Sequence, residues 1–85
     1  MPAISRFFGI VISMYHKDHL YPHFHARYGE NEISVDIRTG SITGRFPPNA
    51  SRLVREWLNL HRIELMENWR LAGTHQLLNP IAPLE

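Results

Sequence analysis

The chain has 85 residues, a formal net charge of +1 and a hydrophobic content of 44%. This length predicts one domain, residues 1–85, with a modest core, and so small a net charge does not indicate binding to nucleic acid. The absence of cysteine excludes a disulfide framework and a thiolate metal site, and it fits a reducing cytoplasm.

The first apolar segments predict two strands. Residues 3–8 and 10–15 are apolar or β-branched, and Gly9 separates them, so we expect a short break or bulge at the glycine. The run is far too short to span a membrane, and no small-residue cleavage site follows it. We therefore expect a cytoplasmic protein without a signal peptide.

Residues 16–25 hold four of the six histidines. Pro22 cannot donate to a strand ladder, so we expect a strand to begin after it. From residue 23 to residue 28 the side chains alternate in character, which predicts a strand with one buried and one polar face. The polar face would carry His23, His25 and Arg27.

The next strands should extend this sheet as an antiparallel meander. Gly29 and Glu30 indicate a turn, residues 31–37 alternate again, and residues 42–46 follow a second turn at Thr39 and Gly40. A two-residue loop at residues 29–30 pairs His23 with Asp36, whereas a four-residue loop places His25 opposite Asp36. Either register puts a carboxylate beside a histidine, within side-chain reach. Arg45 has the right parity to join the same face.

An apolar stripe at three- and four-residue steps predicts a helix over about residues 49–72. Asn49 is the expected N-cap, and Gly73 suits the helix end. One straight helix would be long for this domain, so we expect a break near His61 or an overhang, and the long stripe suggests a homodimer through the helix.

Residues 74–85 should be extended. The expected fold is α+β, with a four- or five-stranded antiparallel meander, one long C-terminal helix packed on one face, and an extended tail; the strands fall within residues 3–46.

The polar strand face fits catalysis on a phosphodiester. Histidines can act as general base and general acid, a carboxylate can orient them, and arginines can hold the phosphate. The candidate catalytic residues are His23, His25 and Asp36, and the candidate phosphate-binding residues are Arg27 and Arg45. No metal or other cofactor is needed for such a ribonuclease-like activity.

The spacing leaves other readings open. His19, His23 and His25 could supply three nitrogen ligands to zinc or another divalent transition metal. The histidines could instead be structural, and the exposed sheet could serve a non-catalytic interaction module that docks a partner strand. His61 lies between Trp57 and Leu65 on the apolar stripe, so we place it in or beside the core, away from His23 and His25.

With these motifs the chain resembles a small bacterial family, domain of unknown function 4160. The matching segments are MPAISRFFGIVISMY, DHLYPHFHA, ISVDIRTGSI, LVREWLNLHRIELMENW and IAPL. The resemblance implies a small cytoplasmic protein, and genes of this family often lie beside one for a second family, domain of unknown function 2442. That arrangement looks like a toxin–antitoxin module, so it implies a small cognate protein as partner. The histidine-bearing strand face adds RNA as a further candidate partner. It implies no catalytic residues.

Overall fold

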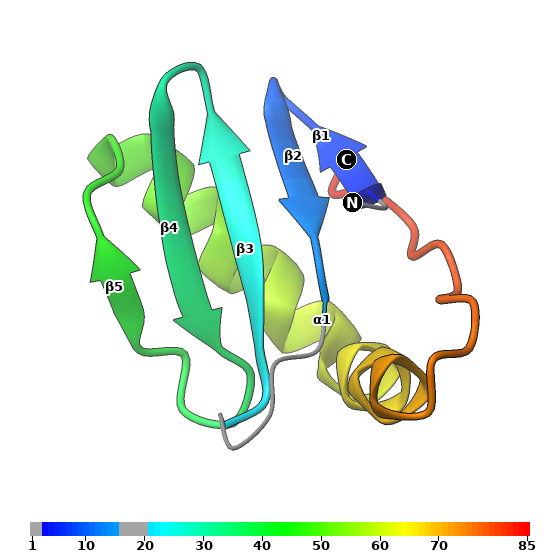
Figure 1. Ribbon diagram of the computed structural model, residues 1–85. Helices are drawn as coiled ribbons and strands as arrows, with labels where there is room; N and C mark the ends of the chain where they lie inside the picture. The colour runs from blue at the N-terminus through cyan, green and yellow to red at the C-terminus, as the bar shows by residue number, and fades with distance from the viewer. Residues whose placement is uncertain (1–2, 16–20) are drawn as a thin grey trace.

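The computed structural model describes residues 3–15 and 21–85. Within them, five strands form one antiparallel sheet in chain order, and one helix follows. The elements are β1 (Ala3–Phe7), β2 (Ile10–Ser13), β3 (His23–Tyr28), β4 (Asn31–Asp36), β5 (Ile42–Gly44) and α1 (Pro48–Gly73). Because α1 covers one face of the sheet and an extended tail follows it (Figure 1), the predicted α+β fold is confirmed, with five strands.

The turn between β3 and β4 has the two-residue loop. Tyr28 pairs with Asn31 and His23 with Asp36, which is the first of the two registers considered above. Gly29 has φ +61°, a left-handed conformation that glycine adopts without steric cost. The register therefore sets which polar side chains become neighbours on the face of the sheet that α1 does not cover.

The core lies between the sheet and the first half of α1. Trp57 is fully buried, and its ring centroid lies 5.4 Å from that of Phe7 and 5.6 Å from that of Phe24. Tilted and edge-to-face rings at this spacing are favourable aromatic contacts. Strand residues of one parity supply the opposite wall of this core; they include Ile10, Ile12, Phe24, Ala26, Ile33 and Val35.

The helix bends at His61, whose backbone has the non-helical angles φ −124° and ψ 23°. The break expected near His61 is thus present. The first half of α1 runs behind the sheet, and the second half turns beyond the ends of β2 and β3 (Figure 1). At the other end, the N-cap is Pro47 without a side-chain hydrogen bond, so the prediction that Asn49 caps the helix is wrong. Pro48 instead opens the helix, where proline's missing N–H costs nothing.

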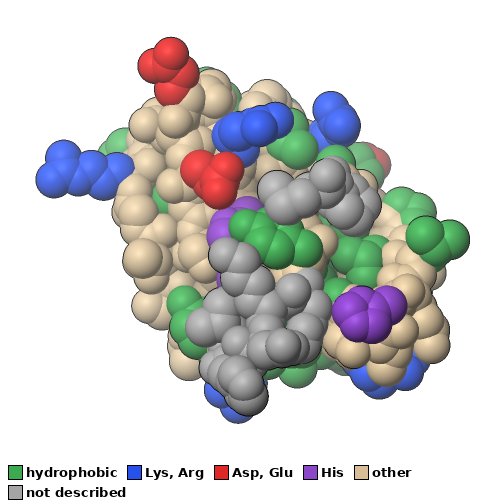
Figure 2. Space-filling view, in the orientation of Figure 1, with side chains coloured by type: hydrophobic (Ala, Val, Ile, Leu, Met, Phe, Trp, Pro, Cys, Tyr) green, Lys and Arg blue, Asp and Glu red, His purple; other side chains and the backbone are tan. Residues whose placement is uncertain are grey.

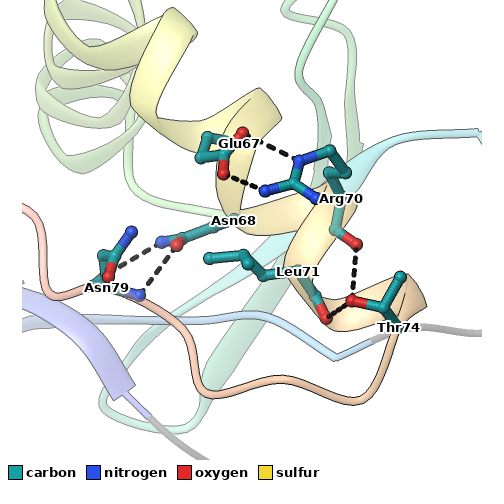
Figure 3. Close-up of polar contacts among 6 residues, drawn as sticks. All are labelled: Glu67, Asn68, Arg70, Leu71, Thr74 and Asn79. Carbon is teal, nitrogen blue, oxygen red and sulfur yellow. Dashed lines mark hydrogen bonds and ion pairs between the residues drawn. The ribbon is translucent and has the colours of Figure 1, made fainter.

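The tail packs along the edge of the sheet at β1. The backbone N–H of Ile81 donates to the carbonyl of Ile4 at 2.8 Å, and the indole Nε1 of Trp57 donates to the carbonyl of Ala82 at 2.9 Å. The side-chain amide of Asn68 holds the backbone of Asn79 through two further bonds (Figure 3). These contacts show that the extended tail lies on the body of the same chain.

The outer side of α1 carries exposed apolar side chains. Leu60 is 68% exposed and Ile63 is 87% exposed. The homodimer that the apolar stripe of the helix suggested stays a prediction. No helix in residues 3–15 and 21–85 combines the length and apolarity needed to cross a membrane.

Candidate functional site

The face of the sheet away from the core carries two rows of paired side chains. In one row Arg6 pairs with Val11, Val11 with Arg27, and Arg27 with Glu32. In the neighbouring row, Ala3, Ser13, His25 and Ser34 are paired in the same way. Adjacent strands lie about 4.8 Å apart, so Arg6 and Arg27 stand roughly 10 Å apart at their backbones, on either side of Val11. Both long side chains can reach a ligand above Val11.

A β-bulge puts Arg6 on this face. The pairing of β1 with β2 shifts between Ala3, which faces Ser13, and Ser5, which faces Ile12. The extra residue in β1 reverses the alternation of its side chains. Arg6 and Ala3 therefore share a face although an odd number of residue steps separates them.

These side chains surround a pocket of about 200 Å³. Its lining residues are Ala3, Arg6, Val11, Ser13, His25, Arg27 and Glu32, and we call it the His25 pocket. Figure 2, which views the same side as Figure 1, shows histidine atoms at the surface beside an acidic side chain, with basic side chains close by. The pocket thus combines two guanidinium groups, one imidazole and one carboxylate.

His25 is held by contacts on two sides. Its Nδ1 lies 3.5 Å from Oε2 of Glu32, and its ring stacks on Tyr15 with a centroid distance of 4.8 Å and an interplanar angle of 4°. These two contacts limit the orientation of the imidazole. The side chain keeps 16% of its surface exposed while its Nε2 is buried, so His25 is held in place with only part of its ring at the surface.

His23 has a different environment although it is only two residues away. It is 4% exposed, and its Nδ1 donates to the carbonyl of Tyr21 at 2.9 Å. Its ring lies 5.2 Å from Trp69, because the second half of α1 turns past the start of β3. The ring also meets His25 edge-on at 5.2 Å. His23 therefore packs against the ring of His25 and does not itself line the His25 pocket.

Asp36 and Arg45 also lie outside the pocket. Asp36 is opposite His23 in the register, as predicted, but its Oδ1 accepts hydrogen bonds from the backbone N–H groups of Arg38 at 2.8 Å and Thr39 at 3.2 Å. Its carboxylate thus closes the turn that follows β4. β5 ends at Gly44, so Arg45 follows the strand and is not among the lining residues.

The structure shows no three-ligand metal cluster in residues 3–15 and 21–85. The predicted ligand His19 lies outside the described residues, so only His23 and His25 of that set can be located. His61 is on the core side: its ring lies 5.6 Å from Trp57, and its Nδ1 lies 2.6 Å from Oε1 of Glu64. His61 takes no part in the His25 pocket.

Sequence reasoning missed two charged residues of the pocket. Glu32 has the same parity as Asp36 and lies diagonally across from His25, so diagonal cross-strand neighbours would have revealed it. Arg6 was missed because its position depends on the bulge in β1. A simple alternation rule places Arg6 on the wrong face.

The arrangement suits an anionic ligand with an ionisable or transferable proton. Two guanidinium groups can bind the oxygens of a phosphate bidentately. A histidine in contact with a carboxylate supplies one group that can donate a proton and one that can accept it near neutral pH. Cleavage of a phosphodiester can use groups of these kinds.

The searches of curated proteins and of solved structures found no match to the chain. A family model, described as "Domain of unknown function (DUF4160)", matches residues 9–70. The matched part includes β2 to β5 and α1 as far as Arg70, and with them His25, Arg27 and Glu32 of the pocket. Because the match extends over most of its 85 residues, the chain belongs to the family of domain of unknown function DUF4160.

Proposed function

We propose that this protein is one component of a bacterial two-gene toxin–antitoxin-like module and that it acts on RNA at the His25 pocket. The observation that carries the RNA part is the convergence of His25, Glu32, Arg6 and Arg27 on one accessible pocket. The module part is supported by the sequence resemblance described above, because genes of that family often lie beside a second small gene. The proposal places the protein in the cytoplasm, where RNA and the cognate protein, of the domain of unknown function 2442 type, would meet it.

The chemistry we propose is metal-independent cleavage of the RNA backbone. Arg6 and Arg27 bind the phosphate oxygens and stabilise the charge that develops on them. The Glu32 carboxylate takes the proton of the ribose 2′-hydroxyl, and that oxygen attacks phosphorus. The bond to the 5′-oxygen breaks, His25 donates a proton to this leaving group, and the products are a 2′,3′-cyclic phosphate and a free 5′-hydroxyl.

His23 acts in this proposal through His25. Its ring contacts that of His25 at 5.2 Å while its Nδ1 is bound to the carbonyl of Tyr21. A buried imidazole with a fixed tautomer holds its neighbour in place but cannot reach a ligand in the pocket. Glu32 therefore replaces His23 as the partner of His25 in acid–base catalysis.

The cleavage test uses purified, tag-free protein and end-labelled single-stranded RNA in the presence of a chelator. Replacement His25→Gln or Glu32→Gln should lower the cleavage rate by about 10²-fold or more, as for a lost general acid or base. The products should carry a 2′,3′-cyclic phosphate end. No cleavage by the unmodified protein, or cleavage by both variants at the rate of the unmodified protein, would remove the enzymatic proposal.

A matched arginine pair tests the binding part separately. Arg27 lines the pocket and Arg45 does not, although both were candidates for phosphate contact. Arg27→Gln should weaken RNA binding, measured by fluorescence anisotropy, by about tenfold, whereas Arg45→Gln should change it by less than about twofold. Equal losses in the two variants would mean that general surface charge, and not the pocket, attracts RNA.

The cognate partner is tested by co-expression. The protein and the product of the adjacent gene should elute together from a sizing column at a mass above that of either alone. Separate elution at all protein concentrations would contradict the module part and leave the RNA part standing.

A further inference from the structure

A second cationic pocket lies on another part of the molecule, between the turn that follows β4 and the first half of α1. Its volume is about 300 Å³. Its lining residues are Thr39, Gly40, Ser41, Arg55, Leu58, Asn59 and Arg62, and we call it the Arg62 pocket. Two guanidinium groups and no carboxylate line it, and none of its residues lines the His25 pocket.

Arg62 is fixed in place before any ligand arrives. Its Nε donates to the carbonyl of Ile37 at 2.8 Å, and one Nη donates to Oδ1 of Asn59 at 3.2 Å. The bend of α1 at His61, the preceding residue, accompanies this contact with the end of the sheet. A guanidinium held by two bonds still presents N–H donors on its remaining nitrogen, and little further side-chain entropy is lost when a ligand binds.

Arg55 completes the cationic wall. It lies two helical turns before Arg62, on the same side of α1, and it is exposed. Buried Leu58 lies between them and forms an apolar floor. Two arginines at this spacing can contact different oxygens of one tetrahedral anion.

The turn supplies hydroxyl groups and a tight backbone. Oγ1 of Thr39 accepts a hydrogen bond from the N–H of Ser41 at 3.2 Å, which leaves the hydroxyl proton able to donate. Gly40 has φ +79°, which allows the turn to fold against Leu58. The carboxylate of Asp36, at the start of the turn, accepts two backbone hydrogen bonds within the turn. The pocket therefore presents donors to a ligand.

From this geometry we infer that the Arg62 pocket is a second, independent anion site, which binds a phosphate group between Arg55, Arg62 and the hydroxyl groups of the turn. The inference does not rest on the proposed action at the His25 pocket. The shared ligand chemistry is a phosphate oxyanion, either a terminal monoester or a backbone diester.

The test is an NMR titration of the intact chain with inorganic phosphate at constant ionic strength. The amide signals of Gly40 and Ser41 and the Nε signal of Arg62 should shift and saturate together. Arg55→Gln should weaken this binding by about tenfold, whereas Arg52→Gln, which alters an exposed arginine of the same helix outside the pocket, should change it by less than about twofold. Both substitutions are exposed, so both variants should fold.

Shifts that do not saturate, or equal losses in the two variants, would overturn the inference. Parallel titrations with a nucleoside 5′-monophosphate and with a dinucleoside phosphate lacking a terminal phosphate identify the source: saturation by only the first indicates a terminal phosphate, and saturation by the second indicates a nucleic-acid backbone. Failure of RNA cleavage with phosphate still bound at Gly40 and Ser41 would refute the proposed function alone.

Discussion

Asn68 is a polar residue in the apolar core, and its role is to hold the tail. It is 0% exposed. Its Nδ2 donates to the carbonyl of Asn79 and its Oδ1 accepts from the N–H of Asn79, both at 2.8 Å. The side-chain amide thus imitates a paired backbone strand, which satisfies its own polar atoms in a buried site.

Replacement of Asn68 should therefore destabilise the fold more than replacement of its partner. Asn68→Leu keeps the branched shape of the side chain but removes both hydrogen bonds, so we expect the free energy of unfolding to fall by about 2 kcal/mol. Asn79→Ala keeps the backbone groups that Asn68 binds and should cost less than about 0.5 kcal/mol. Urea denaturation measures both variants, and equal losses would contradict this role of the amide.

At the scale of elements, the pairing of β4 with β5 depends on a glycine. Gly44 has φ +113°, and a Cβ at this position would lie 2.9 Å from the carbonyl oxygen of Glu32. The obstacle is backbone, which cannot move aside like a flexible side chain. Gly44 therefore permits the close approach of two strands beside the residue that supplies the carboxylate of the His25 pocket.

We expect Gly44→Ala to lower the free energy of unfolding by about 3 kcal/mol, through backbone strain and this clash. Gly29→Ala is the matched comparison, because Gly29 also has a positive φ but nothing lies within 4 Å of an added Cβ. Gly29→Ala should lower the free energy of unfolding by about 1 kcal/mol, which is the cost of the left-handed backbone conformation alone. Thermal or chemical unfolding of both variants checks the difference, and a Gly44→Ala variant no less stable than Gly29→Ala would refute the argument.

The last turns of α1 contain an ion pair with a measurable effect on acidity. The hydrogen bonds from Arg70 to the Glu67 carboxylate (Figure 3), and secondarily its charge, lower the pKa of Glu67 below the ordinary value of 4.5. A carboxyl whose pKa is depressed on folding contributes stability that is present above pH 4.5 and is lost as the pH falls through the lowered pKa. NMR titration should show the pKa of Glu67 rising toward 4.5 in Arg70→Gln. An unchanged pKa would contradict the assignment.

At the scale of the whole molecule, the tail packs against the edge of the sheet at β1. An edge strand exposes unpaired N–H and C=O groups that invite pairing with another chain. Here the N–H of Ile81 binds the carbonyl of Ile4 in β1, and the Ile81 side chain is 4% exposed. The tail is thus part of the core as well as a cover for the edge.

Two substitutions within the tail compare a buried side chain with an exposed one. Ile81→Ala removes buried methyl groups and should lower the free energy of unfolding by about 3 kcal/mol. Leu77→Ala alters a side chain that is 94% exposed, so we expect a change within about 0.5 kcal/mol. Denaturation curves of the two variants measure the difference in stability. Similar midpoints for Ile81→Ala and Leu77→Ala would show that the tail does not stabilise the body in solution.

Local rules in the sequence predicted the α+β fold and the β3–β4 turn: glycine at turns, alternation in strands and apolar steps of three and four in a helix. The break near His61 was expected from the length of the helix relative to so small a domain. The helix start was misplaced at Asn49 because local preference for an asparagine cap competes with the fixed φ of Pro48, and the proline decides the geometry.

The sequence by itself determined that His23, His25 and Arg27 share one side of a strand. Only the tertiary structure decided which of them a ligand can reach. Trp69 covers His23 because the helix bends and turns past the start of β3, and the bulge in β1 brings Arg6 beside the partly buried His25. Both effects join segments far apart in the chain, so their outcome depends on packing and register, which a pattern of neighbouring residues does not contain.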